Sequence, residues 1–336
     1  MQFNRGKKIV ISVCVVFLFL LAPVYLGAYN LHLLTFIVFN SVLGISLRFI
    51  MLCGSLYLGH TAFMGIGGYI TALLVVKLDS PFELALLASA AAAMVLAIIL
   101  GLIVLRLRGV YFIIVSIALV EIIRLFVTWW SPVTGGTAGV YVPKPTIFGI
   151  HLSTPAHLYL FVCILGLITF FVLYKLEESR FGVTLKGIAQ AEELAAAVGV
   201  NVTNYKVAAF SIGSLIAALC GAFFAFYMQF IAPQYVSFLT AVYILIYCIV
   251  GGLSSIWGPI VGAAAMTLLS EPLRGMTYYE MLSYGVILIA IVLLLPNGLI
   301  SLPSMIPELF KKMSDFMDRS KTLFSIARSR TEKAKK

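Results

Sequence analysis

The chain has 336 residues, of which 62% are hydrophobic and only 11% are charged. Soluble domains carry roughly a quarter charged residues and about half apolar ones, so the composition argues against a soluble enzyme, a nucleic-acid-binding domain and a disordered chain. The net charge of +10 is concentrated at the chain ends, which favours contact with anionic lipid over nucleic acid. We therefore expect an integral membrane protein.

Long apolar runs recur along the chain. A helix needs about 20 apolar residues to cross the hydrocarbon core of a membrane, which is about 30 Å thick. Runs of this kind cover residues 9–28, 33–53, 60–78, 83–105, 110–130, 156–175, 206–228, 238–252, 256–273 and 281–300. Lipid offers no partner for an open backbone, and the alternating pattern of a membrane barrel is missing from the sequence. The expected fold is all-α, a polytopic transmembrane helical bundle of about ten spans.

Lysine and arginine set the expected orientation. With the N-terminus in the cytoplasm and ten spans, 19 of the 23 basic residues fall on the inner side. The outer side receives Lys77, Lys144 and Arg274, and Arg124 lies within a span. Because inner loops are enriched in Lys and Arg, both termini are expected in the cytoplasm. The first run is long and lacks a small-residue cleavage site, so we expect it to remain as a helix rather than act as a signal peptide.

We divide the chain into a transmembrane domain, residues 1–305, and a basic cytoplasmic tail, residues 306–336. The outer loop at 131–155 contains glycines and prolines that predict turns and short irregular segments. The inner loop at 176–205 is the most charged interior segment, and we expect a helical stretch in it from 185 to 198. The tail is compatible both with a helix on the inner leaflet and with a solvated basic segment.

No group of residues predicts catalysis. The four histidines are scattered, no carboxylates are paired for acid–base work, and no phosphate-binding loop is present. The five cysteines fall singly in apolar stretches, which is typical of small buried hydrophobic residues and not of a disulfide framework or a metal site. We expect no enzyme activity, no cofactor and no metal.

Two charged residues lie deep in an expected span. Glu121 is about 16 Å from the inner end of the 110–130 span, near the midplane, and Arg124 follows at i+3 on the same helix face. An ionised group at this depth needs a partner or a wet cavity. Both an ion pair that fixes helix packing and a polar point on a substrate path fit this pattern. His60 and Thr134 are weaker path candidates beside glycines at span ends, and a hydrogen-bonded interfacial role for His60 is the favoured alternative.

Glycines cluster near span ends, in residues 59–69 and 251–259. The candidates for breaking helices and exposing backbone groups to a solute are Gly59, Gly65, Gly67, Gly251, Gly252 and Gly258. Broken helices line sites in many transporters. Close packing of helices against small residues explains the same glycines equally well.

The inner loop contains Glu193, Ala195 and Gly199 in a short amphipathic stretch that ends at the glycine. This stretch predicts a compact knob on the cytoplasmic surface. A docking surface and a plain connecting helix are both compatible with the spacing.

Several motifs, in order, resemble those of the permease subunits of bacterial ABC importers for branched-chain amino acids, of the LivM type. The matching segments are residues 58–63 (LGHTAF), 108–112 (RGVYF), 121–124 (EIIR), 134–136 (TGG), 179–182 (SRFG), 193–201 and 251–259 (GGLSSIWGP). They resemble the family's LGHAAF segment, its RGVYF…EIIR helix, its TGG loop, its cytoplasmic coupling loop and its GGLGSIWGP signature. Each pattern is weak alone, but their order and spacing over roughly residues 30 to 300 are specific.

The resemblance implies a permease of the bacterial inner membrane whose ATP hydrolysis takes place on other subunits. In the family this subunit pairs with a second permease of the LivH type, two cytoplasmic ATPases and a periplasmic or lipid-anchored substrate-binding protein. Glu193, Ala195 and Gly199 occupy the positions of the family's E-x-A-x3-G loop, which seats on the ATPase. The resemblance therefore implies that the knob docks there.

Two positions depart from the family pattern. Ala138 stands where an acidic residue often follows TGG, which weakens a role for the outer loop in substrate chemistry, and Asn297 replaces a common arginine. Close relatives serve urea or short amides, and the sequence does not separate these substrates from branched-chain amino acids. A secondary transporter working alone, with Glu121 as its ion-coupling carboxylate, is a further alternative.

Overall fold

The computed structural model describes residues 25–144, 146–147, 150–151, 154–271 and 298–301, with the single positions 23, 282, 285, 286, 289, 293 and 295. The first and last expected spans, at 9–28 and 281–300, lie largely outside the described residues. The tail at 306–336, Cys14 and Asn297 lie wholly outside them.

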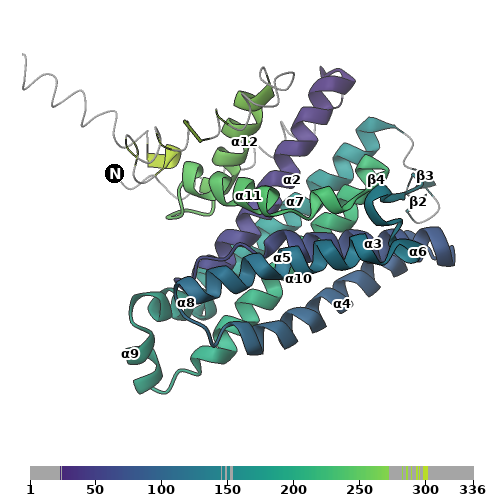
Figure 1. Ribbon diagram of the computed structural model, residues 1–336. Coiled ribbons are helices and arrows are strands. Elements are labelled where there is room, and N and C mark those ends of the chain that lie inside the picture. Colours follow the sequence, from purple (N-terminus) through teal and green to yellow (C-terminus); the bar gives the residue numbers. More distant parts are fainter. Residues whose placement is uncertain are drawn as a thin grey trace, which may run out of the picture.

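Helices make up most of the described chain (Figure 1). The long ones are α2 (Ala28–Met51), α3 (His60–Leu78), α4 (Phe82–Val104), α5 (Val110–Trp129), α7 (Pro155–Glu178), α10 (Val202–Met228), α11 (Phe238–Gly251) and α12 (Gly258–Ser270). The short ones are α6 (Ser131–Thr134), α8 (Arg180–Gln190), α9 (Glu192–Ala197) and three 3-10 turns at Gly136–Ala138, Pro233–Tyr235 and Leu299–Ser301. The strands are β1 (Val140–Tyr141), β2 (Thr146–Ile147), β3 (Ile150–His151) and β4 (Phe230–Ile231).

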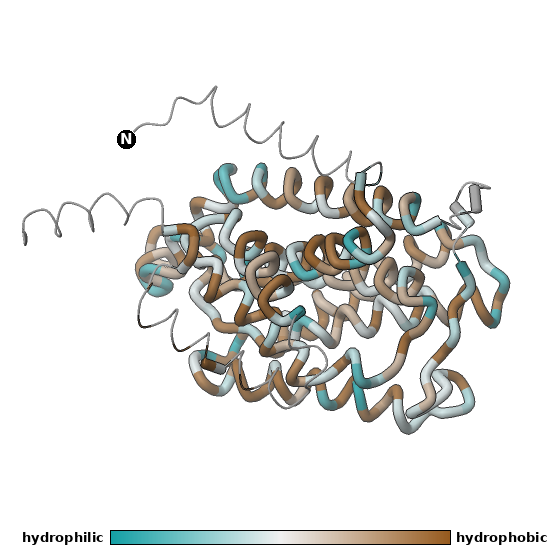
Figure 2. The backbone as a smooth tube through the Cα atoms, turned by 90° about the horizontal axis from the view of Figure 1, so that it is seen from above, coloured by the Kyte–Doolittle hydropathy of each residue, from teal (hydrophilic) through white to brown (hydrophobic). Residues whose placement is uncertain are grey.

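In the described part of the chain, seven helical segments are long and apolar enough to cross a membrane. They are α2, α3, α4, α5, α7, α10 and the segment Pro233–Gly251 that contains α11. Each coincides with an expected span to within a few residues, and α3 has the expected bounds of 60–78. Hydrophobic residues run along the long helices in the view of Figure 2. The all-α polytopic bundle is confirmed.

The span expected at 256–273 is described only as far as Glu271. Its helix, α12, has 13 residues from Gly258 to Ser270 and is about 20 Å long at the helical rise. It packs closely on α11, because a Cβ on Gly262 would overlap the carbonyl oxygen of Tyr247. The glycines therefore draw α11 and α12 together as a short hairpin.

Close packing of α10 against α3 forms the middle of the bundle. A Cβ on Gly67 would overlap the carbonyl oxygen of Ala218, and a Cβ on Gly221 would overlap that of Met64. Helix α3 runs without interruption through Gly65 and Gly67, so the expectation that these two residues break a helix is wrong. Their missing side chains allow the two backbones to approach, which is the packing alternative.

The other four candidate glycines flank helix ends. Gly59 precedes α3, Gly251 ends α11 and Gly258 begins α12. Gly252 follows α11 with φ +108°, a conformation that side chains rarely adopt. The backbone therefore turns at these positions rather than within a helix.

The two ends of the bundle carry different structures. The strands and α6 gather at one end in Figure 1, and α8 and α9 lie at the other. Strand β1 pairs with β4 in antiparallel register, Val140 opposite Ile231, and β2 pairs with β3, Thr146 opposite His151. The outer loop is thus built from turns, one helical turn and two-residue strands, in agreement with its composition.

The helical stretch expected at 185–198 is divided into two helices. Helix α8 ends at Gln190, Ala191 is extended with φ −154° and ψ 87°, and α9 begins at Glu192. Leu185 and Ile188 of α8 are buried in the bundle, whereas α9 buries none of its residues. The break lets α8 pack against the membrane helices while α9 projects from them.

Four cysteines in the described chain are free and buried, namely Cys53, Cys163, Cys220 and Cys248. They pack in the apolar interior as small hydrophobic residues, as expected.

Candidate functional site

The charged pair of α5 forms an ion pair within the helix. The guanidinium of Arg124 lies 2.6 Å from Oε2 of Glu121, and its Nε donates to the same oxygen at 2.7 Å. Each side chain is 36% exposed. The two charges therefore neutralise each other locally, but the described chain does not cover them.

The pair lies at the edge of the buried face of α5, between the residues packed on the bundle and the most exposed ones. The buried residues of α5 are Phe112, Ser116, Val120 and Val127. Glu121, Arg124 and Thr128 follow at i, i+3 and i+7 and share the adjacent face, where the Thr128 hydroxyl donates to the carbonyl of Arg124 at 2.8 Å. Helix α5 lies along the near side of the bundle in Figure 1. A polar stripe that the described residues leave partly exposed on a transmembrane helix requires a protein partner or a wet path beside it.

His60 is buried at the junction of α2 and α3. It is 1% exposed, and its Nε2 lies 2.8 Å from the hydroxyl oxygen of Ser46. The His60 Nδ1 atom and the hydroxyl of nearby Tyr57 have no hydrogen-bond partner among the described residues. Burial also raises the pKa of the Tyr57 phenol well above its usual value, so this group stays neutral. His60 ties two helices together, and its part in a substrate path stays a prediction.

Thr134 organises the turn that follows α5. Its hydroxyl donates to the carbonyl oxygens of Val127 and Trp130 at 2.5 Å and 2.9 Å, and it accepts from the backbone N–H of Gly136. The side chain is buried. These bonds occupy the hydroxyl within the outer loop, and its proposed place on a substrate path also stays a prediction.

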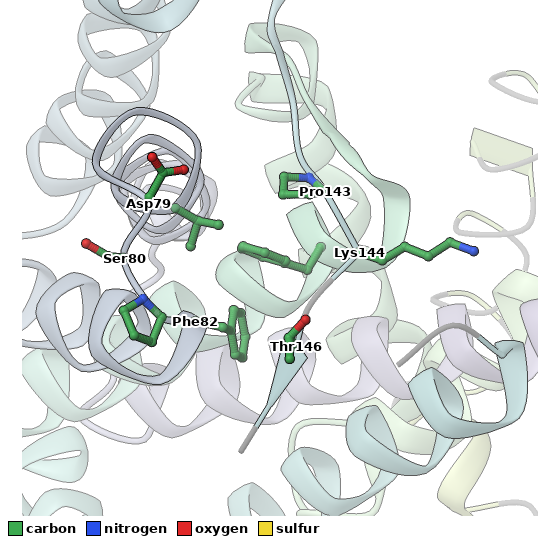
Figure 3. A pocket seen from close by; sticks show the side chains of 9 residues that line it. Asp79, Ser80, Phe82, Pro143, Lys144 and Thr146 are labelled. Atoms are coloured by element: carbon green, nitrogen blue, oxygen red, sulfur yellow. The ribbon is translucent and has the colours of Figure 1, made fainter. Parts of the chain in front are cut away.

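A pocket of about 270 Å³ opens at the strand-bearing end of the bundle (Figure 3). Asp79, Ser80 and Phe82 line one side, and Pro143, Lys144 and Thr146 line the other. In Figure 3 the Lys144 ammonium points away from the other labelled residues rather than toward Asp79. The charges therefore do not converge on one ligand in this conformation.

The knob expected in the inner loop is formed by α9 and the turn after it. Glu193 is 92% exposed, and Ala195 lies on the same short helix. Gly199 has φ +89°, its N–H donates to the carbonyl of Ala196, and the N–H of Val200 donates to the carbonyl of Ala195. The glycine is required here because only a residue without a Cβ adopts this conformation at little cost.

Glu192 attaches the knob to two other elements. Its carboxylate lies 2.8 Å from Nζ of Lys206 on α10 and 3.5 Å from the guanidinium of Arg108, which precedes α5. Lys206 is almost completely buried, whereas Arg108 is exposed. Glu192 cannot be recognised from the sequence, because it resembles a second surface carboxylate beside Glu193.

A buried ion-pair cluster lies where α2, α7 and α8 meet. Arg48 binds Glu177 through two nitrogen–oxygen contacts of 2.6 Å and 3.0 Å, and Lys186 binds the same carboxylate at 2.8 Å. In the sequence, these residues resemble ordinary charges near the ends of spans. Arg48 and Glu177 are 129 residues apart, so their contact is not visible before the chain folds. Among the described residues, no group of histidine, cysteine and carboxylate side chains is placed to hold a metal ion.

A family model described as the permease component of branched-chain amino acid transport systems matches residues 29–295. The chain belongs to this family. It is 30% identical over 297 residues to LivM of Salmonella typhimurium, a high-affinity branched-chain amino acid transport system permease protein, across 80% of this chain and 68% of the relative. LivM of Escherichia coli is 29% identical over 293 residues, with the same coverage of both chains. No solved structure gives a significant match.

Family membership confirms the resemblance that the ordered motifs indicated. The matched region includes every long helix of the described chain except the first residue of α2. The chain is therefore a multi-pass membrane protein and a component of a transporter rather than an enzyme. The candidate sites for its function are the polar stripe of α5 and the α8–α9 region.

Proposed function

We propose that this chain is one permease subunit of an ATP-driven importer that moves leucine, isoleucine and valine across a bacterial inner membrane. The family match over residues 29–295 is the observation that carries the proposal. Two permeases, two cytoplasmic ATPases and a periplasmic or lipid-anchored binding protein complete the importer. The second permease is of the LivH type.

In this proposal the chain has about ten spans and both termini in the cytoplasm, with a transmembrane domain at 1–305 and a basic tail at 306–336. The distribution of Lys and Arg supports this orientation. Helices α8 and α9 then face the cytoplasm and the short strands face outward. Their location at opposite ends of the bundle agrees with that arrangement (Figure 1).

The α9 knob is the proposed docking point for an ATPase. Glu193 and Gly199 are exposed, and α9 projects from the bundle without burying a residue. The knob is exposed, and Glu192 ties it to Arg108 and to Lys206 by ion pairs. A partner that binds the knob can therefore displace the elements connected to it. Movement there would switch the permease pair between outward-facing and inward-facing states.

The α5 stripe is the proposed wall of the substrate path, on the side that faces the second permease. Glu121 and Arg124 are half-exposed near the middle of a span, and lipid is an unfavourable neighbour for them. A branched-chain amino acid is itself a zwitterion with an apolar side chain. A helix face that offers one carboxylate, one guanidinium and flanking apolar residues matches that chemistry.

Two other functions are less well supported. Urea or short amides would use the same machinery, but the family model and both relatives name branched-chain amino acids. A secondary transporter would use Glu121 for ion coupling, yet this carboxylate is already paired with Arg124. The family match favours the importer over both.

Uptake into vesicles tests the proposal. The chain, the second permease and the ATPase are reconstituted together, and the substrate-loaded binding protein is added outside. We expect uptake of labelled leucine that requires ATP in the vesicle lumen and is not driven by an ion gradient. Uptake of urea but not leucine, or uptake by this chain alone on an ion gradient, would contradict the proposal.

A further inference from the structure

The guanidinium of Arg48 connects three elements at the cytoplasmic end of the bundle. Arg48 lies in the last turn of α2 and its side chain is only 2% exposed. Two of its nitrogens bind the carboxylate of Glu177 on α7, at 2.6 Å and 3.0 Å. Its Nε donates to the carbonyl oxygen of Leu253 at 2.8 Å, in the loop between α11 and α12. Each of the three guanidinium nitrogens therefore donates to a fixed partner.

Glu177 extends this connection to the coupling region. Its carboxylate also accepts from Nζ of Lys186 on α8 at 2.8 Å, and its side chain is 11% exposed. Lys186 itself is 48% exposed and lies on the solvent side of α8. A continuous path of charged contacts thus runs from α8 through Glu177 and Arg48 to the α11–α12 loop.

The backbone around this path packs closely against α8. A Cβ on Gly182 of α8 would overlap the carbonyl oxygen of Glu177, and the ring of Phe181 stacks on that of Phe49. A displacement of α8 is therefore passed to the ends of α7 and α2 rather than absorbed between them.

The far end of the path is a closely packed, glycine-rich turn. Gly252, immediately before Leu253, has φ +108°, and Gly251 and Gly258 pack backbone against backbone. These glycines join two short helices, α11 and α12, through a loop without helical structure. The carbonyl of Leu253 is the point at which Arg48 holds that loop.

Stability alone is a weak reason for this arrangement. A buried ion pair gains little free energy over well-packed apolar residues, because both charges lose their water. Its geometric specificity is the more useful property, since a bidentate pair permits one relative position of its helices. A pair that forms in one state of the permease and breaks in the other would be part of a switch.

We propose that Arg48, Glu177 and Lys186 form an ion-pair relay that transmits movement of α8 to the α11–α12 loop during the transport cycle. This inference rests on the proposed function, because it requires that an ATPase docked on α9 also displaces α8, which directly precedes α9 in the chain. The three residues are positioning residues and do not touch the substrate. The relay complements the α9 knob, which receives the push but is tied to Arg108 and Lys206 instead.

The test is the number of leucine molecules transported per ATP hydrolysed by the reconstituted importer. In Glu177→Gln the carboxylate charge is lost while the side-chain volume is kept, and we expect this ratio to fall by about threefold to tenfold. In Lys186→Gln only the α8 end of the relay is removed, and we expect a smaller fall of about twofold to threefold. ATP hydrolysis should continue in both variants, because the ATPase sites are on other subunits.

The matched control is Glu178→Gln. Glu178 is the neighbouring carboxylate, is exposed, and accepts from the Tyr174 hydroxyl at 2.6 Å without joining the relay. It should keep the wild-type ratio. A purely structural role for the relay would lower protein yield and thermal stability but leave the ratio unchanged in the protein that remains folded.

An unchanged ratio in folded Glu177→Gln and Lys186→Gln would overturn the relay. If Glu177→Gln does not fold, the ratio measured for Lys186→Gln alone tests the relay. The Lys186 side chain is half-exposed, so its replacement should have little effect on folding. Failure of the wild-type importer to use ATP would instead contradict the proposed function. The two failures are thereby distinguished.

Discussion

Exchanging Gly199 for alanine, or Glu193 for lysine, should reduce leucine uptake by about tenfold or more. At Gly199 the φ of +89° imposes a strain of about 1–2 kcal/mol on any residue with a Cβ, enough to displace the turn after α9. At Glu193 the charge reversal changes a side chain that is 92% exposed and whose contact with Arg108 is long, at 3.9 Å. An exposed pair of this kind contributes little to folding, so we expect the loss to arise at the proposed docking surface.

Both variants are measured by uptake and by co-purification of the ATPase. The control for the glycine is Gly187→Ala on α8, where a Cβ also meets no atom within 4 Å but φ is not positive. It should transport normally. Normal uptake by both Gly199→Ala and Glu193→Lys would show that the knob is a plain connector and not a docking point.

Replacing Glu121 and Arg124 together should distinguish a role of this ion pair in helix packing from a role in transport. Glu121→Leu alone leaves an unpaired guanidinium in a span, at a cost of about 2.5–3.5 kcal/mol, so we expect loss of both thermal stability and uptake. The double variant Glu121→Leu/Arg124→Leu removes both charges and should recover the stability. If the pair lines the substrate path, uptake should stay about tenfold or more below wild type in this stable protein.

The comparison needs both a stability and an uptake measurement on the same preparation. Ile122→Leu is the control, because Ile122 lies on the same helix with a 60% exposed, uncharged side chain. It should behave as wild type. Full uptake by the double variant would assign the ion pair to helix packing and remove it from the path.

The membrane helices could be predicted because their signal is local and strong. The apolar run at 60–78 has the same bounds as α3, and the other described spans differ from their helices by a few residues at most ends. The spacing of Glu121 and Arg124 likewise placed both on one helix face, and the ion pair is present. Each of these features depends on residues that are close in the sequence.

The features that were missed depend on tertiary contacts. Gly65 and Gly67 lie in a glycine-rich segment of the kind that can break a helix. In the structure they remain helical, and α10 packs closely against α3 beside them. The division of the inner helix at Ala191 has no glycine or proline to mark it, because it results from α8 packing on the bundle while α9 does not.

The Arg48–Glu177 pair was missed for the same reason. Each residue by itself resembles an interfacial charge at the end of a span, and only the fold brings them within 2.6 Å. Contacts between residues that are far apart in the sequence become visible only in the folded structure. The family's function could be inferred from ordered motifs, whereas the relay could not.

The central claim is that α8 and α9 face the cytoplasm, where a separate ATPase can push on them. Gln190, at the exposed end of α8, and Tyr141, exposed on β1 at the other end of the bundle, are replaced singly by cysteine and treated with a membrane-impermeant thiol reagent. The account predicts that Tyr141→Cys is labelled in intact cells and that Gln190→Cys is labelled only after the inner membrane is opened. Labelling of Gln190→Cys in intact cells would place the coupling region outside and contradict the account.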